Sequence, residues 1–315
     1  MPNTAPAMLN NTDDPLARIL DVADGVILGK THVLRLALAC LLARGHLLIE
    51  DLPGVGKTTL AHLLAQLLGL HYARIQFTSD MLPADLIGVS VYDQAGKQFR
   101  FHPGPVFSQL ILADEINRAT PKAQSALLEA MEERQVTVEG ETRPLPKPFF
   151  VIATQNPSHQ VGTFPLPESQ LDRFLMRIEL GYPDAAQEKA LLAGSDRRQL
   201  LAELVPALTP AELLAQQARV DQVHVAPAIV DYCHAILSHT RASGRYHHGL
   251  SPRAGIGLLR AARAWALIAG RDFVLPEDIQ QVLAAVVTHR LTAQGDDGGT
   301  QPSPADDILA SVPVP

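Results

Sequence analysis

The feature that most constrains the fold of this chain is an alternation of strand-like and helical segments that ends near residue 183. Four runs rich in apolar and β-branched residues predict strands, a fifth run is more mixed, and helical segments separate them. This alternation predicts a parallel sheet that helices cover on both faces. The five strand-like runs are His46–Glu50, Ala73–Thr78, Gln109–Asp114, Phe149–Thr154 and Phe174–Leu180.

Two segments interrupt the alternation, and both predict β-hairpins. Val89–Phe101 has a turn at Asp93-Gln94-Ala95-Gly96, and Gln135–Leu145 alternates around Glu139-Gly140. After residue 183 no strand-like run returns, and the helical segments that follow predict a smaller all-α domain. These segments are Ala185–Leu192, Pro210–Gln222, Ala226–Ala242, Pro252–Ala269 and Pro276–Thr288.

The pattern predicts four parts of the chain. Residues 1–14 are polar and unpatterned and predict a flexible tail, and residues 15–183 predict the α/β core. The all-α domain is expected over residues 184–291. Residues 292–315 are rich in Gly, Asp and Pro, a composition that predicts a disordered tail.

Composition narrows the class of protein. Of 315 residues, 47% are hydrophobic and 19% are charged, which is enough apolar material for packed cores. The formal net charge of -7 argues against a protein that coats nucleic acid. The two cysteines, Cys40 and Cys233, lack the spacing of a zinc site. No signal peptide or run of about 20 apolar residues is visible, so we expect a cytoplasmic protein without a membrane span.

A phosphate-binding loop is predicted between the first strand-like run and the next helix. Glu50–Thr59 reads EDLPGVGKTT, and its end matches the pattern GxxxxGK[ST]. Lys57 would reach the β- and γ-phosphates of ATP, and the Thr58 hydroxyl would bind Mg²⁺. One departure is Asp51, which stands where the pattern has its first Gly. The alternative is a Gly-rich turn with a surface lysine.

Two further strand-like runs end in polar side chains. The run QLILADE ends in Asp114, expected to hold Mg²⁺ through water, and Glu115, expected to act as general base. Taken alone, this run could also be a strand followed by a helix cap. The run FFVIATQN ends in Asn156, which could position the attacking water or open the Asn-Pro turn that follows. From the residues alone, both interpretations of Asn156 stay open.

Together these motifs resemble the AAA+ ATPases and, within them, the MoxR family. The resemblance runs from about Asp14 to Leu291. The strings that support it include GHLLIEDLPGVGKTTLA, LADEINRATPKAQSALLEAMEERQVTVEG, FVIATQNP and LPESQLDRF. Of these, DEINRA and LPESQLDRF are specific to this group. A bare phosphate loop would not identify the group.

The resemblance implies an α/β core followed by a helical lid, assembled as a ring, usually a hexamer, with ATP between neighbours. It makes Asn156 the sensor-1 residue, which favours a role at the γ-phosphate over a turn. Arg173 matches the arginine finger offered to a neighbour's ATP, and Arg253 matches sensor 2, which touches the γ-phosphate. Gly29, with Val26 to Leu28, matches the wall of the adenine pocket. Arg118 could contact the subunit interface or be a charge on a helix surface.

The predicted site can therefore be stated residue by residue. Expected catalytic residues are Glu115, Asn156, Arg173 and Arg253. Expected nucleotide-binding residues are Gly29, Pro53, Gly54, Val55, Gly56, Lys57, Thr58, Thr59 and Asp114, of which Thr58 and Asp114 also serve the metal.

The resemblance also implies what the ATPase does. It points to chaperone-like remodelling, activation or metal loading of a partner complex, commonly one with a von Willebrand factor A domain. A nucleic-acid motor is an alternative, which the mixed and acidic hairpin tips disfavour. A nucleotide-gated scaffold with negligible hydrolysis is another. The histidines around His247-His248 could suggest a metal site, although solvated or hydrogen-bonded histidines explain them as well.

Overall fold

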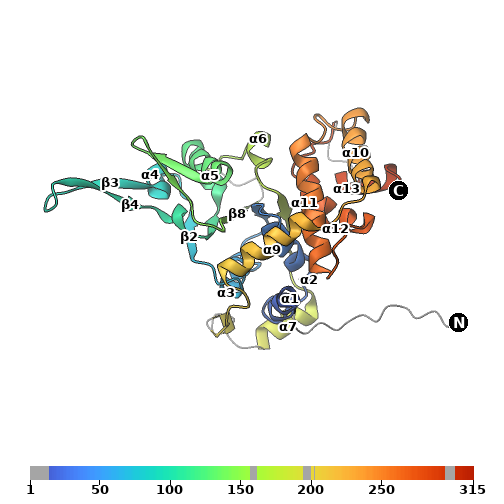
Figure 1. Cartoon of the computed structure of the whole chain (residues 1–315), viewed down its shortest axis with the longest axis horizontal. Helices are drawn as coiled ribbons and strands as arrows, with labels where there is room; N and C mark the ends of the chain where they lie inside the picture. Colours follow the sequence, from blue (N-terminus) through green and yellow to red (C-terminus); the bar gives the residue numbers. More distant parts are fainter. Residues whose placement is uncertain (1–13, 157–161, 194–199, 202, 295–301) are drawn as a thin grey trace.

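The core of the molecule is a five-stranded parallel sheet, as the sequence predicts. In this computed structural model, the described residues are 14–156, 162–193, 200–201, 203–294 and 302–315. The strand order is β2-β5-β8-β1-β9, and each neighbouring pair is parallel (Figure 1). The strands are β1 (Leu47–Glu50), β2 (Tyr72–Gln76), β5 (Leu110–Asp114), β8 (Phe150–Gln155) and β9 (Met176–Ile178).

The inner strands are apolar except at their carboxyl ends, because both faces of the sheet are covered. All five residues of β5 are buried. Alternate residues enter different hydrophobic clusters, since successive side chains of a strand point to opposite faces. On one face, Leu47 and Leu110 join a cluster that includes side chains of the helices α2 (Thr31–Leu42) and α3 (Lys57–Leu67). On the other face, Leu48 and Ile111 pack with side chains of the helix α5 (Pro121–Glu133).

The helices of the core begin at recognisable signals. Asp14 caps the first helix, and its Oδ1 accepts a hydrogen bond from Leu16 N at 3.1 Å. Thr120 caps α5 in the same way, and a proline follows each cap, where its missing N–H costs little. The helices are α1 (Pro15–Val26), α2 (Thr31–Leu42), α3 (Lys57–Leu67), α4 (Pro83–Ile87), α5 (Pro121–Glu133), α6 (Glu168–Leu171) and α7 (Ala185–Ala193).

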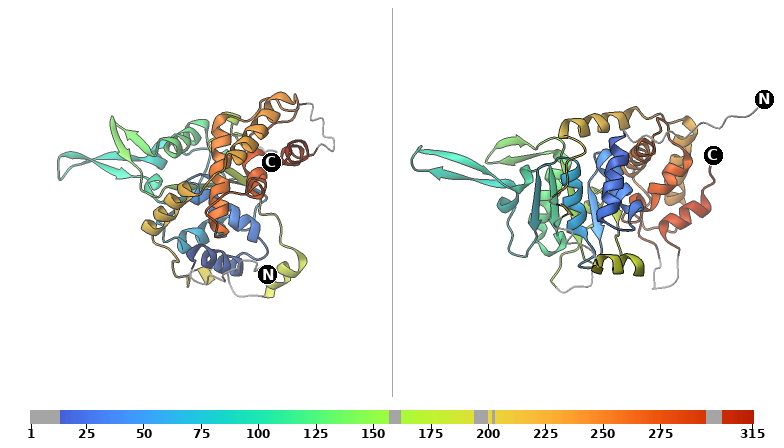
Figure 2. Two further views of the ribbon diagram at one scale, coloured as in Figure 1. Left: turned by 45° about the vertical axis from the view of Figure 1, so that its right-hand side comes forward. Right: turned by 90° about the horizontal axis from the view of Figure 1, so that it is seen from below.

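Both predicted hairpins are present. The first consists of β3 (Gly88–Asp93) and β4 (Gln98–Pro103), and the second of β6 (Gln135–Val138) and β7 (Glu141–Pro144). The β3–β4 hairpin extends away from the body of the protein, on the side opposite the C-terminal helices (Figures 1 and 2).

The C-terminal part is helical, as predicted, and shares a hydrophobic cluster with the core. It contains α9 (Pro210–Gln222), α10 (Pro227–Ala242), α11 (Pro252–Ile268) and α12 (Pro276–Val287). The long helix α11 packs against α9, α10 and α12 and also against α2 of the core. The cluster that covers one face of the sheet therefore continues into these helices. The expected domain boundary near residue 183 stays a prediction.

The prediction of a disordered tail over residues 292–315 is wrong for its last part. A further helix, α13 (Pro304–Ser311), packs against α10 and α12. Ser303 caps it, and Ala305 and Ile308 are buried. The Gly, Asp and Pro content of the whole stretch concealed this short amphipathic helix, because composition averages over segments that behave differently. Of the other expected tail, residues 1–13 lie outside the described residues.

A buried carboxylate strengthens the attachment of α13. Asp307 is 5% exposed and accepts hydrogen bonds from the Tyr246 hydroxyl at 2.7 Å and from Nε2 of His239 at 3.3 Å. Arg245 pairs with the same carboxylate. His239 is thereby hydrogen-bonded to a carboxylate. Among the described residues, no group of three or more His, Cys, Asp or Glu side chains could hold a metal ion.

None of the helices in the described ranges combines the length and the apolar character needed to cross a membrane.

Candidate active site

The phosphate loop lies between β1 and α3 and has the backbone that its glycines predict. Gly54 and Gly56 have φ angles of 85° and 100°, in the left-handed region that favours glycine. A Cβ atom at either position would meet nothing within 4 Å, so the backbone angle, and not crowding, calls for glycine. At the start of α3 no side chain caps the helix, which leaves its first N–H groups suited to an anion.

Asp51, the departure from the phosphate-loop pattern, ties the loop to the edge of the sheet. Its side chain is buried, and Oδ2 accepts hydrogen bonds from Leu180 N at 2.7 Å and Gly181 N at 2.6 Å. Oδ1 accepts a third bond from Leu52 N at 2.7 Å. A glycine could make none of these contacts. The sequence showed only the departure, and the structure shows that the carboxylate joins the start of the loop to the chain that follows β9.

Lys57, the first residue of α3, is 8% exposed and lies among acceptors. Its Nζ donates to the carbonyl oxygen of Asp51 at 2.6 Å and to Oδ1 of Asn156 at 3.2 Å. An ammonium group has three donors, so, counting only contacts with described residues, one remains for a ligand. Burial lowers the pKa of Lys57 below its ordinary value, while the carboxylates of Asp51, Asp114 and Glu115 act in the opposite direction.

Asp114 ends β5 and is held by the two strands beside it. Its Oδ1 accepts a hydrogen bond from the Thr154 hydroxyl at 2.6 Å, from β8. Its Oδ2 accepts two hydrogen bonds from Arg74 of β2, from a terminal nitrogen at 2.7 Å and from Nε at 3.2 Å. Because the carboxyl ends of parallel strands meet at one edge, residues far apart in sequence come together here.

Glu115 follows immediately and has a positive φ of 56°, which turns the chain sharply at the strand end. Its Oε1 accepts a hydrogen bond from Nδ2 of Asn156 at 3.1 Å. Its Oε2 accepts one from Nε2 of Gln76 at 2.9 Å and pairs with Nε of Arg118 at 3.0 Å. Asn156 thus bridges Lys57 and Glu115. The sequence left two roles open for Arg118, a contact at the subunit interface or a charge on a helix surface. In the structure, Arg118 pairs with Glu115 of the same chain.

Most of the predicted nucleotide-binding and catalytic residues surround one hollow of about 340 Å³. The residues that line it are Pro53, Gly54, Gly56, Lys57, Thr58, Thr59, Arg74, Asp114, Glu115 and Asn156. We call this the phosphate hollow. Val55 and Gly29 are not among its lining residues. At Gly29, a Cβ atom would fall 1.8 Å from Nε2 of Gln187, so α7 covers this glycine. Its role in an adenine pocket stays a prediction.

Arg173 and Arg253 lie elsewhere, in a second hollow of about 230 Å³. Nε of Arg173 pairs with Oε2 of Glu132 at 3.1 Å, and a terminal nitrogen of Arg253 pairs with Oε1 of the same carboxylate at 2.9 Å. Six arginines line this second hollow, which we call the arginine hollow: Arg44, Arg134, Arg173, Arg253, Arg260 and Arg290. The structure therefore brings the two predicted arginines to each other and not to the phosphate hollow.

The arginine hollow lies beside a buried histidine that stays neutral. His46 is fully enclosed, and its Nδ1 accepts a hydrogen bond from Val151 N at 3.0 Å while Nε2 lies 3.1 Å from the Met131 carbonyl oxygen. These two contacts require the proton on Nε2. Burial lowers the pKa of His46 to about 4, with Arg134 and Arg253 adding to the effect.

The donor set of the phosphate hollow fits a magnesium ion. A hydroxyl oxygen from Thr58 and a carboxylate oxygen from Asp114 line the same hollow, and oxygen ligands are those that Mg²⁺ prefers. Mg²⁺ typically binds one or two carboxylates together with substrate phosphates, so a protein site of few ligands is the expected kind.

Comparison with known proteins agrees with this geometry. The model of the ATPase family associated with various cellular activities (AAA) matches residues 46–176, and that of the AAA lid domain matches residues 238–311. Chaperone MoxR1 of Mycobacterium tuberculosis (strain ATCC 25618 / H37Rv) is 38% identical over 95% of this chain and 82% of its own length. The chain belongs to the MoxR family of AAA+ ATPases.

Two further proteins match nearly all of the chain. Protein MoxR of Paracoccus denitrificans is 34% identical over 98% of this chain and 99% of its own. A crystal structure of a proposed ATPase from Cytophaga hutchinsonii superposes with a TM-score of 0.87 at 36% identity, covering 96% of this chain and 95% of that one. The lid match ends at residue 311, the last residue of α13, so this helix belongs to the matched lid.

Several residues of this MoxR-family site were missed by sequence reasoning. Arg74 and Thr154 hold the two oxygens of Asp114, Gln76 binds Glu115, and Glu132 joins the two predicted arginines. Arg74 had a visible signal, since a charged residue interrupts the strand text Ala73–Thr78. Glu132 had none, because it lies among other acidic residues of a helix.

Proposed function

We propose that this MoxR-family protein binds ATP with Mg²⁺ and hydrolyses it at the interfaces between subunits of a ring. One observation carries the proposal. The residues suited to hold phosphates and activate water line one hollow, while Arg173 and Arg253 line another. We therefore infer that Arg173 and Arg253 act on the phosphates of ATP bound by an adjacent subunit.

Within one chain, the phosphate hollow supplies binding and orientation. The loop N–H groups and the remaining donor of Lys57 hold the β- and γ-phosphates of ATP. Thr58 and, through water, Asp114 would hold Mg²⁺, which when bound neutralises charge on the phosphates. Asp51 keeps the loop in place through its bonds to Leu180 and Gly181.

Glu115 and Asn156 serve the attacking water. A carboxylate at this strand end can accept the proton of a water molecule aimed at the γ-phosphate, and the neighbouring amide can orient that water. The Asn156 amide already bridges Lys57 and Glu115, which places phosphate holding and water activation in one hydrogen-bonded chain. Gln76 and Arg118 engage Oε2 of Glu115, so Oε1, which accepts a hydrogen bond from Asn156 and has a second lone pair, is the oxygen suited to accept the proton.

Arg173 supplies positive charge to the transition state of the adjacent subunit, and Arg253 does so from the lid. A finger of this kind contributes about 10³–10⁵ in rate. A ring, in our proposal a hexamer, is therefore needed for turnover, and an isolated chain is nearly inactive.

The work of this ATPase, in our proposal, is chaperone-like remodelling, activation or metal loading of a partner complex in the cytoplasm. The name of its relative MoxR1 describes that protein as a chaperone. A protein with a von Willebrand factor A domain is the partner that we propose. The β3–β4 hairpin offers exposed aromatic side chains for such a contact, since Tyr92 and Phe99 meet edge to face with ring centroids 5.4 Å apart and are 49% and 70% exposed.

The first test is the ATPase rate per subunit as a function of protein concentration, with molecular size from light scattering. We expect the specific rate to rise as a ring forms. Arg173→Ala should lower the rate of the assembled ring by about 10³–10⁵. Mixing it with Lys57→Ala should restore part of the activity, because some interfaces then join an intact phosphate hollow to an intact arginine hollow. A constant rate from a stable monomer would contradict the proposal.

A further inference from the structure

The carboxylate of Glu132 holds two arginines from different parts of the fold. Glu132 lies in the last turn of α5, Arg173 follows α6 in the core, and Arg253 is the second residue of α11. Each guanidinium takes one oxygen of the carboxylate, at 3.1 Å and 2.9 Å. This one acidic side chain therefore contacts an arginine of the core and an arginine of the lid.

The other acids near the arginine hollow are paired elsewhere. Arg290 pairs with Asp172 at 2.7 Å. Arg44 and Arg260 share Asp221 at 2.9 Å and 3.2 Å. Among the described residues, Glu132 is the carboxylate that forms ion pairs with both Arg173 and Arg253.

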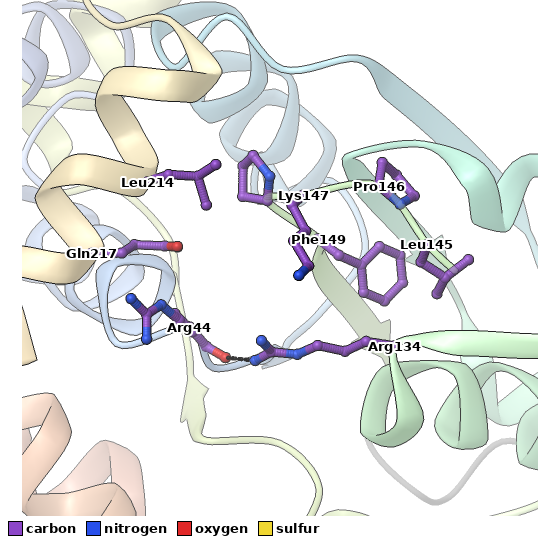
Figure 3. Close-up of a pocket in the computed structure, with 9 residues that line it drawn as sticks. Arg44, Arg134, Leu145, Pro146, Lys147, Phe149, Leu214 and Gln217 are labelled. Carbon is purple, nitrogen blue, oxygen red and sulfur yellow. Dashed lines mark hydrogen bonds between the residues drawn. The ribbon is translucent and has the colours of Figure 1, made fainter. Parts of the chain in front are cut away.

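The surroundings are strongly basic, so these two guanidinium groups need a counter-charge to stay close. An adjoining hollow of about 300 Å³ shares Arg44 and Arg134 with the arginine hollow, and Lys147 adds a further cation there (Figure 3). Like charges at such separations repel, and the repulsion is partly screened because the side chains are half-exposed. Without Glu132, Arg173 and Arg253 would move apart into solvent.

The bonds to Glu132 leave donors free for another anion. Arg173 is bound through Nε, at the side of the guanidinium, and Arg253 through one terminal nitrogen. In the part of the chain that the structure describes, both terminal nitrogens of Arg173 remain available for the paired contact that guanidinium makes with phosphate. The carboxylate thus orients the arginines without using the donors that a phosphate would take.

We propose that Glu132 is a positioning residue that holds Arg173 and Arg253 as a pair facing the ATP of the adjacent subunit. This inference rests on the proposed function above and deepens it. The carboxylate of Glu132 would then couple the position of the lid to the activity of the neighbouring ATP site. A movement of α11 would move Arg253, and through Glu132 it would change how Arg173 is held.

The test compares Glu132→Ala and Glu132→Gln with the matched control Glu133→Gln. Glu133 is the next residue on α5, is exposed, and has no ion pair among the described residues. We expect kcat of the assembled Glu132→Ala ring to fall roughly 10- to 100-fold, since displacement of a positioned group by about 1 Å can cost this much. KM for ATP and the affinity for a fluorescent ATP analogue should stay unchanged, because the phosphate hollow is intact. Glu133→Gln should behave as the wild type.

Mixed rings separate positioning from general damage to the fold. Glu132→Ala mixed with Lys57→Ala should regain activity, since interfaces then form between the intact phosphate hollow of one variant and the intact arginine hollow of the other. Glu132→Ala mixed with Arg173→Ala should regain none, because both changes affect the same hollow. Glu132→Gln keeps the size of the side chain and provides the same comparison if the alanine variant unfolds.

Two results would overturn the inference. One is a wild-type kcat in both Glu132 variants. The other is failure of Glu132→Ala to complement Lys57→Ala while Arg173→Ala does complement it, which would reject positioning by Glu132 and leave the proposed function standing. Failure of Arg173→Ala to complement Lys57→Ala would instead reject the shared site itself.

Discussion

The phosphate hollow and the arginine hollow differ in whether one chain satisfies their charges. In the phosphate hollow, Lys57, Asp114, Glu115 and Asn156 are hydrogen-bonded to one another or to neighbouring strands. In the arginine hollow, six arginines surround a space whose lining acids are Glu132 and Asp172. The side chains of the phosphate hollow are thus held by hydrogen bonds within the chain. The arginine hollow has more positive than negative side chains, which suits an anion from outside the chain.

This difference follows from how each hollow is built. The phosphate hollow lies where adjacent parallel strands end, so the hydrogen bonding of the sheet sets the distances between its side chains. The arginine hollow lies between the core and the lid, where α5 and the turn after α6 meet α11. The second hollow is lined by residues of both the core and the lid, whereas the first is lined by core residues.

The largest expected effect within the phosphate hollow is that of Glu115→Gln. Loss of a general base lowers turnover by about 10²–10⁴, while binding of ATP is retained because the phosphate loop is unchanged. Steady-state ATPase assays and binding of a fluorescent nucleotide analogue measure the two properties separately. Glu129→Gln, an exposed change on α5, serves as control. Hydrolysis at the wild-type rate would exclude Glu115 as the base.

A second prediction concerns the stability of the lid, at a helix that lines neither hollow. Ile308 of α13 is fully buried, so Ile308→Ala should lower the free energy of unfolding by about 2–5 kcal/mol, from lost burial and the cavity left behind. Leu309→Ala, at a neighbouring residue that is 40% exposed, should change it by only about 0.5 kcal/mol. Chemical denaturation measures both variants. Equal effects would mean that α13 does not pack on the lid, and nucleotide affinity of folded protein should stay unchanged.

The smallest expected effect is that of Arg74→Ala in the phosphate hollow. Arg74 is half-exposed and binds Oδ2 of Asp114, the carboxylate that would hold Mg²⁺ through water, so its removal should ease metal binding. An exposed ion pair is worth up to about 1 kcal/mol, which corresponds to roughly a fivefold lower Mg²⁺ requirement. Titration of Mg²⁺-dependent binding of a nucleotide analogue measures it, with Arg74→Lys, which retains the charge, as control. An unchanged or higher Mg²⁺ requirement would show that Arg74 does not compete with the metal.

Much of the fold could be predicted because its elements are marked locally. The strand ends that carry Asp114 and Asn156 follow buried apolar runs, and helix starts such as Pro121 and Pro210 have a capping residue just before them. The C-terminal helix was missed because a cap at Ser303 and buried side chains over two turns are a weak signal within a Gly- and Pro-rich stretch.

The sequence by itself determined the phosphate loop and the polar side chains that end successive strands, such as Asp114 and Asn156. It also determined that a helical lid follows an α/β core. These depend on short-range patterns of apolar residues, caps and glycines. Tertiary structure alone decided that Asp51 would bind Leu180 and Gly181, and that Glu132 would join Arg173 to Arg253, a residue 121 positions away. Such contacts depend on how helices and strands pack, and no local pattern encodes the partner of an exposed charged side chain.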